Sequence, residues 1–176
     1  MEYFDIFDSP LGEIVLTCDS EYLTAVFFAG QKYADRYLAP DAIQGSFPVL
    51  EDAKTWLAQY FRGNIPEHLP AVKLTGTPFQ KQVWELLMEI PYGETVTYGE
   101  LAKKLGCRSA QAVGGAVGRN PISILIPCHR VVGASGNLTG YAGGVEKKEY
   151  LLTLERAFPC GKAFRIQIAT SLRSSQ

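Results

Sequence analysis

The sequence predicts an α+β protein in which a small antiparallel sheet with one covering helix precedes a helical domain. Three short runs rich in aromatic and β-branched residues lie within positions 3–28 and are separated by turn-forming residues. Helix-capping patterns recur from residue 77 onward. We therefore expect an N-terminal α/β domain with its linker over 1–75, a C-terminal domain over 76–160 and a tail of unknown role over 161–176.

The N-terminal elements follow from the spacing of apolar residues. Strands are expected over 3–7, 13–18 and 23–28. A helix over about 48–62 should have Pro48 in its first turn and end at Gly63. Residues 64–76 show no period and are expected to link the two domains. The helix positions that should cover the sheet are Leu50, Ala53, Leu57 and Tyr60 or Phe61.

Helix signals recur along the C-terminal domain. In the capping boxes at 77–80 and 97–100, a threonine is followed three residues later by glutamine or glutamate. Ser109 can cap a third helix, and two short helices joined by a tight turn form a helix-turn-helix. The expected elements are helices from 78 to before Pro91, from 98 to before Gly106 and over 110–118, then a loop over 133–144 and a helix over about 145–157.

The helix expected over 110–118 contains a glycine pair, Gly114 and Gly115. Each glycine inside a helix costs roughly 1 kcal/mol relative to alanine, so a close approach to another surface should compensate. One interpretation is tight packing against a neighbouring helix. The other is a recognition helix whose small side chains let its backbone enter a narrow groove. The sequence alone leaves both open.

Composition and charge limit the class of protein. The chain of 176 residues has an ordinary globular composition, no apolar stretch of membrane-spanning length and no signal-peptide pattern in its first residues. Its four cysteines are scattered, which favours free thiols in the cytoplasm. Residues 1–75 carry 11 acidic and 5 basic side chains, whereas 76–160 carry 7 and 9. The excess of basic over acidic side chains in residues 76–160 is weak evidence for nucleic-acid binding.

The segment 124–133 places a cysteine and a histidine at the end of an apolar run. Residues 124–126 are expected to form a buried strand or extended segment that holds the thiol rigidly. Cys128 follows a proline and stands beside a histidine and an arginine, which favours a lowered pKa and a reactive thiolate. His129 can accept the thiol proton directly or through water, and Glu155 is a candidate to orient it. A cysteine hydrolase is an alternative at this point, whereas a zinc site lacks ligand spacing.

Motifs spread over residues 76–158 combine into one pattern. They are Thr77-Pro78-Phe79-Gln80, Val83-Trp84, Ile90-Pro91-Tyr92-Gly93-Glu94-Thr95, Thr97-Tyr98, Asn120-Pro121, Pro127-Cys128-His129-Arg130-Val131 and Gly140-Tyr141-Ala142-Gly143-Gly144. This pattern resembles the O6-alkylguanine-DNA alkyltransferases. In the first half the resemblance is weaker and rests on Ser9-Pro10-Leu11-Gly12 and the strand pattern. It implies a ribonuclease H-like N-terminal domain and a winged helix-turn-helix after it.

The resemblance implies DNA repair by a single, irreversible transfer. Cys128 would take the alkyl group, such as methyl, from O6 of a flipped guanine and keep it as a thioether, with activity on O4-alkylthymine left open. His129 would take the thiol proton through water, Glu155 would hold His129, and Tyr98 would donate to the leaving guanine. Asn120 would fix the turn before the thiol segment and Lys148 would support the network. The implied contacts to the base are at Val131, Tyr141, Ala142 and Gly143.

The target base must leave the duplex before its O6 substituent can reach a buried thiol. The resemblance implies that the recognition helix enters the minor groove and that one side chain fills the gap. That side chain is commonly arginine, but here it is Gln111, which has no charge and less stacking surface. We therefore expect weaker duplex binding, partly offset by Arg108. The expected DNA contacts are Arg108, Ala110, Gln111, Gly114, Gly115, Arg119 and Arg130.

No cofactor and no metal are expected. The cysteine and histidine side chains of the N-terminal half are only Cys18 and His68, which are too few for a tetrahedral zinc site. The expected partner is double-stranded DNA carrying O6-alkylguanine, and no membrane association is expected. We expect the protein to act as a monomer, in the cytoplasm or in the nucleus of a eukaryote. Two other classes compete with this expectation. A winged-helix DNA-binding module without chemistry would not need Cys128, and a cysteine hydrolase would need a water path for turnover.

Overall fold

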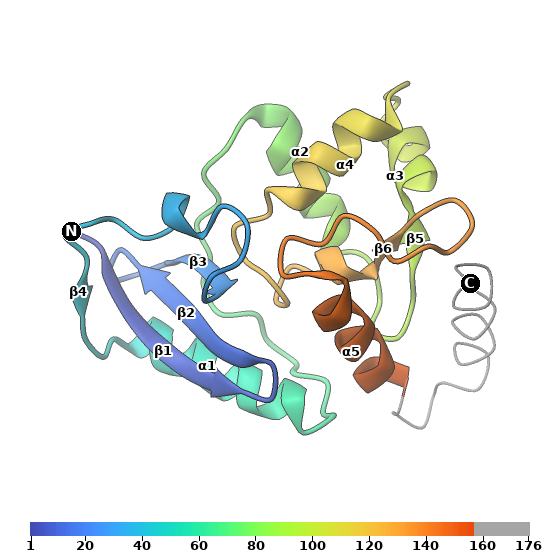
Figure 1. Cartoon of the computed structure of the whole chain (residues 1–176). Helices are drawn as coiled ribbons and strands as arrows, with labels where there is room; N and C mark the ends of the chain where they lie inside the picture. The colour runs from blue at the N-terminus through green and yellow to red at the C-terminus, as the bar shows by residue number, and fades with distance from the viewer. Residues whose placement is uncertain (157–176) are drawn as a thin grey trace. The chain divides into compact units, whose positions relative to one another are not determined.

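The computed structural model describes residues 1–156, which form two compact units (Figure 1). The first unit contains Met1–Thr75 together with Pro121–Leu125. The second contains Gly76–Asn120 and the described chain from Ile126 onward. The tail expected over 161–176 lies outside the described residues. The sequence did not predict that residues 121–125, which follow the helix expected over 110–118, would belong to the first unit.

The sheet of the first unit has the strand order β3-β2-β1-β4. β1 (Tyr3–Ser9), β2 (Gly12–Cys18) and β3 (Leu23–Phe28) pair antiparallel, as predicted. β4 (Ile43–Gln44) adds a short parallel pair beside β1, so the sheet is not purely antiparallel. A two-residue strand has too little alternation to be recognised in a sequence.

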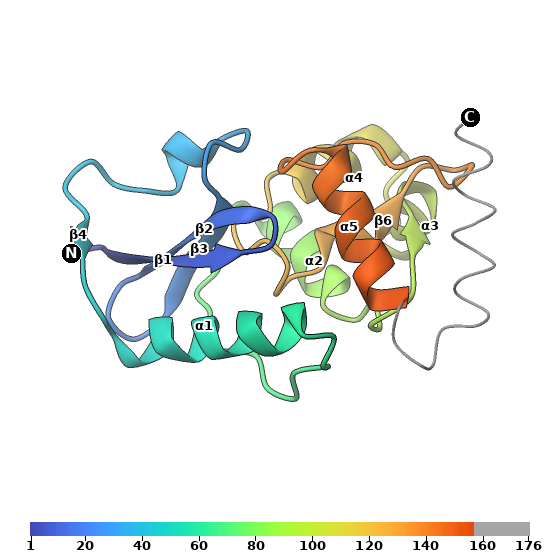
Figure 2. The same cartoon turned by 60° about the horizontal axis from the view of Figure 1, so that its bottom comes forward.

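One helix covers this sheet, as the apolar spacing predicted. α1 (Pro48–Phe61) has proline in its first turn and packs along β1, β2 and β3 (Figure 2). Its buried residues include Leu50, Ala53, Leu57 and Tyr60, which confirms the predicted face. Gly63 follows with a φ of 85°, the left-handed conformation that commonly ends a helix.

Residues 64–76 are more than a linker. The amide of Leu23 donates to the Ala71 carbonyl at 2.8 Å, and the amide of Lys73 donates to the Leu23 carbonyl at 2.9 Å. Residues 71–73 therefore pair with the start of β3. The absence of a period in this segment could not predict the pairing, because main-chain hydrogen bonds need no side-chain period. A short 3-10 turn, η1 (Ala34–Arg36), also escaped prediction.

The helices of the second unit begin at the predicted caps. Capping boxes at Thr77 and Thr97 open two of them, and the Ser109 hydroxyl accepts the Ala112 amide at the start of a third. β5 (Val96–Thr97) and β6 (Val131–Val132) form a parallel pair. The wing expected beside the helix-turn-helix stays a prediction. No helix within residues 1–156 is long and apolar enough to cross a membrane. The helix bounds are α2 (Pro78–Leu87), α3 (Tyr98–Lys104), α4 (Ala110–Gly118) and α5 (Val145–Arg156).

Candidate active site

The chain that leads to the cysteine is a turn. The amide of Val26 donates to the Pro121 carbonyl and the amide of Ser123 donates to the Val26 carbonyl, each at 2.8 Å. Ile124 then has a φ of 70°, which is strained for a β-branched side chain. The predicted strand over 124–126 is therefore wrong. Burial explains the apolar run, since residues 122–126 are all buried within a turn.

The thiol itself lies on a short 3-10 helix, η2 (Cys128–Arg130), and Cys128 is 6% exposed. Asn120, just after α4, donates from Nδ2 to the Ile126 carbonyl at 2.9 Å and also bonds the Cys128 side chain. Burial raises the pKa of the Cys128 thiol, although the Asn120 bond and the Lys148 charge oppose this effect. The expected lowered pKa is thus wrong. The thiol holds its proton until a base removes it.

A buried base stands next to the thiol in the chain. His129 is fully buried, and its Nε2 lies 2.6 Å from Oε1 of Glu155, a buried carboxylate on α5. Arg130 contacts the same carboxylate from Nε at 3.0 Å and from Nη2 at 2.9 Å, while its Nη1 donates to the Ile90 carbonyl at 2.7 Å. The amide of Gly93 donates to the other Glu155 oxygen at 3.2 Å. Three residues, Gly93, His129 and Arg130, therefore converge on one carboxylate.

This convergence sets the protonation states. Burial raises the pKa of the Glu155 carboxyl, but His129 and Arg130 outweigh it and hold the value at about 2. Burial lowers the pKa of His129 below its ordinary 6.5, and Arg130 acts in the same direction while Glu155 opposes both. At neutral pH the carboxylate is charged and the imidazole is neutral. Nε2 then carries the proton toward Glu155, and Nδ1 is the basic nitrogen.

A second group of polar side chains meets at one carbonyl. The hydroxyl of Tyr98, the first residue of α3, donates to the Thr139 carbonyl at 3.1 Å. Nζ of Lys148 donates to the same oxygen at 2.9 Å and lies 5.9 Å from the centre of the Tyr98 ring. Burial raises the pKa of Tyr98 to about 12 and lowers that of Lys148 to about 8. Tyr98 is therefore a neutral donor, and the Cys128 thiolate would favour the charged form of Lys148.

The residues expected to contact the base lie in β6 and in the loop before α5. Val131 is fully buried, whereas Tyr141, Ala142 and Gly143 are half-buried. Burial raises the pKa of Tyr141 well above its ordinary value, and the charges of Cys128 and Glu155 add to this effect. The Tyr141 hydroxyl is therefore neutral at ordinary pH.

The expected DNA-contact residues divide into two groups. Arg108, Ala110, Gln111, Gly115 and Arg119 are exposed along or beside α4, and Gly114 is half-buried against the Tyr98 ring. Arg130 differs, because its side chain is 10% exposed and bound to Glu155. We therefore remove Arg130 from the DNA contacts and assign it to the buried network. A Cβ added to Gly115 would meet no described atom within 4 Å, so packing inside the described chain does not require that glycine.

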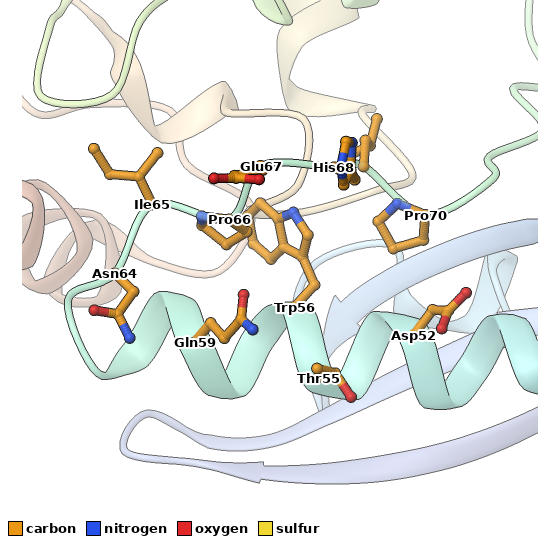
Figure 3. A pocket seen from close by; sticks show the side chains of 11 residues that line it. Asp52, Thr55, Trp56, Gln59, Asn64, Ile65, Pro66, Glu67, His68 and Pro70 are labelled. Atoms are coloured by element: carbon orange, nitrogen blue, oxygen red, sulfur yellow. The ribbon is translucent and has the colours of Figure 1, made fainter.

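Other candidate features do not coincide with these groups. A cavity of about 600 Å³ lies between α1 and residues 64–70, with Trp56 and His68 among its lining residues (Figure 3). None of the site residues predicted from the sequence lines it. Within residues 1–156, no group of three or more His, Cys, Asp or Glu side chains is placed to hold a metal. Cys18, Cys107 and Cys128 are free thiols.

Both units match one protein family. The "6-O-methylguanine DNA methyltransferase, ribonuclease-like domain" matches residues 3–74, and the "6-O-methylguanine DNA methyltransferase, DNA binding domain" matches residues 78–157. The chain therefore belongs to the 6-O-methylguanine DNA methyltransferase family. The predicted family and fold class are confirmed by these matches.

Particular relatives support the same conclusion. The methylated-DNA–protein-cysteine methyltransferase of Methanosarcina acetivorans is 47% identical over 155 residues, which is 87% of this chain and 97% of that protein. The protein of the same name from Haemophilus influenzae is 41% identical over 157 residues, 88% of this chain and 86% of that one. A crystal structure of Mycobacterium tuberculosis OGT in complex with DNA is 40% identical, has a TM-score of 0.81 and covers 88% of this chain and 93% of that one.

Proposed function

We propose that this chain repairs DNA by moving an alkyl group from O6 of guanine to Sγ of Cys128. The sulfur attacks the alkyl carbon, the bond from that carbon to O6 breaks, and its electron pair leaves with guanine. The thioether product has no easily hydrolysed bond, so each molecule acts once. The observation that carries this proposal is the buried Cys128 thiol followed in the chain by His129, whose ring Glu155 binds at 2.6 Å.

Proton transfer follows from the protonation states. Because burial raises the pKa of the thiol, a base must remove its proton before attack. Neutral His129 can do so through Nδ1 and one bridging water, and the charged Glu155 stabilises the imidazolium that forms. Asn120 and Lys148 stabilise the thiolate. Tyr98 donates a proton or a hydrogen bond to the leaving guanine, which lowers the cost of its negative charge.

Recognition of DNA is assigned to the exposed side of α4. Its small residues, Ala110, Gly114 and Gly115, let the backbone approach the minor groove, while Arg108 and Arg119 contact phosphates. Gln111 fills the space of the flipped base, and the backbone at Val131, Ala142 and Gly143, beside Tyr141, reads the base edge. We propose that one monomer performs this reaction, in the cytoplasm.

The test is stoichiometric transfer to one thiol. The full chain is incubated with duplex DNA containing O6-methylguanine, digested, and the peptide with Cys128 is weighed. We expect one methyl group per molecule on Cys128 and none in Cys128→Ser. DNA binding without methylation would instead indicate a binding module, and repeated turnover would indicate a hydrolase. Cys107→Ser, which removes a free thiol outside the site, is the matched control.

Gln111→Arg should strengthen DNA binding. Arginine adds a positive charge and a planar stacking surface at the position that fills the vacated base site, so we expect about tenfold tighter binding and faster transfer at fixed salt. Affinity is measured by titration with duplex, and transfer by quenched time courses. Gln82→Arg, on the exposed side of α2, controls for net charge. Unchanged or lower values for both quantities would contradict the assignment of Gln111.

Gly115→Ala should separate stability from DNA binding. The added methyl group meets no described atom within 4 Å, so the higher helix propensity should raise the free energy of unfolding by about 1 kcal/mol. The same methyl group should hinder close approach to DNA and weaken duplex binding about tenfold. Gly99→Ala on α3 controls for helix propensity. Undiminished DNA affinity in Gly115→Ala would rule out close approach at this glycine.

A further inference from the structure

A buried tryptophan joins α2 to the last turn of α4. Trp84 lies on α2 and is 2% exposed. Its indole Nε1 donates to the Ala116 carbonyl of α4 at 2.8 Å, in a buried hydrogen bond. The two helices pack against each other (Figure 1). Because a buried indole N–H needs an acceptor, this bond fixes where the two helices meet.

The Ala116 carbonyl lies where α4 ends. The amide of Arg119 donates to this oxygen and the amide of Asn120 donates to the Val117 carbonyl, each at 3.2 Å. Both bonds span three residues, so the chain tightens into a 3-10 turn at the end of the helix. In a continued α-helix the Asn120 amide would instead donate to the Ala116 carbonyl, four residues back. Trp84 and Arg119 occupy both lone pairs of that oxygen, which favours the end of the helix at this point.

The position of this turn decides where Asn120 lies. Asn120 is 4% exposed, its Nδ2 donates to the Ile126 carbonyl at 2.9 Å, and it also bonds the Cys128 side chain. The bond from Asn120 lowers the pKa of the Cys128 thiol, against the larger effect of burial. Since a hydrogen bond weakens steeply as its angle departs from linear, a small rotation at the end of α4 would weaken both contacts. The indole of Trp84 therefore acts on the thiol through Asn120.

The indole ring is also held at its other end. A Cβ added to Gly76 would lie 2.6 Å from Cη2 of Trp84, closer than real side chains pack. The same atom would lie 2.7 Å from Oε1 of Gln80, whose side chain completes the capping box of α2. The six-membered end of the ring therefore packs against Gly76 and the start of α2, while the five-membered end bonds the Ala116 carbonyl.

We propose that Trp84 is a positioning residue for alkyl transfer: its indole N–H ends α4 at the point that holds the Asn120 side chain against Cys128. This role rests on the transfer to Cys128 proposed above. Loss of the N–H leaves the Ala116 carbonyl with one donor and lets the last turn of α4 move, so that Asn120 stabilises the thiolate less well. The exposed side of α4 keeps its residues, so the chemical step should suffer more than DNA binding.

The first test measures the thiol without DNA. Iodoacetamide reacts with the thiolate, so its rate on Cys128 as a function of pH reports the pKa of that thiol. In Trp84→Phe, which keeps an aromatic ring but has no N–H, the profile should move to higher pH, with about threefold slower alkylation at pH 8. The peptide that carries Cys128 is weighed, so the free thiols Cys18 and Cys107 do not interfere. The titratable groups that act on the thiol are retained in this variant: Tyr98, His129, Tyr141 and Lys148.

The second test measures transfer from duplex DNA that contains O6-methylguanine. At saturating duplex, the rate of methylation of Cys128 in Trp84→Phe should fall about tenfold, because the displaced Asn120 no longer holds the attacking sulfur in place. The duplex concentration that gives half the maximal rate should stay within about twofold, since the exposed side of α4 is unaltered. A role of Trp84 in stability alone would change neither the pH profile of alkylation nor the rate at saturation.

Two controls separate the N–H from the ring. Trp56→Phe makes the same exchange on α1 of the first unit and should behave like the natural sequence in both tests. Trp56 and Trp84 are the two tryptophans of the chain. In the Trp56→Phe background, β-(3-benzothienyl)alanine incorporated at position 84 preserves the shape of the indole but has sulfur in place of the N–H. It should reproduce the effects of Trp84→Phe, without the loss of packing that a smaller ring causes.

Three results decide the proposal. Equal alkylation profiles or equal saturated rates in the natural sequence and the benzothienyl variant would overturn this role of Trp84. A loss confined to DNA affinity would also overturn it, because the bond would then support α4 and not Asn120. If the natural sequence transferred no methyl group, the proposed function would fail, and the alkylation profiles would still decide whether the indole acts on the thiol.

Discussion

Arg130→Met is expected to lower the free energy of unfolding by about 3–5 kcal/mol, because it removes one partner of a buried ion pair. The substitution keeps an apolar side chain of similar length but deletes the contacts to both Glu155 oxygens and to the Ile90 carbonyl. Urea unfolding followed by far-ultraviolet circular dichroism measures the loss. Arg62→Met, an exposed arginine at the end of α1, should cost less than about 0.5 kcal/mol.

The same substitution should also change the pH dependence of transfer, which a purely structural role would not do. Arg130 lowers the pKa of His129, so its removal moves that pKa upward and protonates the base nearer to neutral pH. Transfer measured at pH 7 should fall, and raising the pH should restore much of it. Arg130→Lys retains the charge but offers one ammonium group in place of a planar guanidinium. Its transfer rate at pH 7 should therefore lie between those of the natural sequence and Arg130→Met. A stability loss below about 1 kcal/mol with an unshifted pH profile would contradict this role.

Glu155→Gln is expected to remove a large part of the acid sensitivity of folding. The pKa of Glu155 is about 2 in the folded chain against an ordinary 4.5, so the unfolded chain binds more protons between these values. The stabilisation is complete above pH 4.5 and is lost as the pH falls toward 2, a difference of about 3 kcal/mol. Stability of both proteins is measured across this range. The natural sequence should lose stability more steeply than the variant.

Transfer should suffer as well, since the amide cannot stabilise an imidazolium as a carboxylate does. We expect a rate at pH 7 lower by about a hundredfold. Glu146→Gln changes an exposed glutamate on the same helix and is the matched control for both measurements. Parallel stability curves for the natural sequence and Glu155→Gln between pH 4.5 and 2 would exclude the charged state assigned to Glu155.

Local signals in the sequence predicted most of the helices and the three main strands. The capping boxes at Thr77 and Thr97 depend on residues three positions apart, so they can be identified without tertiary information. The pairing of residues 71–73 with β3 could not, because it uses main-chain groups that every residue has. The predicted strand at 124–126 was wrong because apolar character indicates burial, not conformation.

Sequence motifs predicted the residues of the site, but they did not predict its ion pairs or the direction of its pKa shifts. The thiol, the histidine and the distant glutamate were identified, and the structure brings His129 and Glu155 together. Arg130 was assigned to DNA because a sequence shows its charge and not its partner, which lies 25 positions away. The pKa of Cys128 was expected to fall because two basic residues follow it. Desolvation decides the direction instead, and only the fold reveals burial.

The pairing of Ile122 with Val26 has a consequence for exchanging domains between relatives. A join near residue 75 separates the two halves of the sequence but not the two compact units, since Pro121–Leu125 belongs with the first. A chimaera that takes residues 1–75 from one protein and the rest from another replaces the strand to which this segment bonds. In such a chimaera, β3 of the exchanged half must pair with residues 121–125 of the retained half, in addition to a good fit at the join. This pairing matters because Cys128, the acceptor cysteine, lies three residues after Leu125.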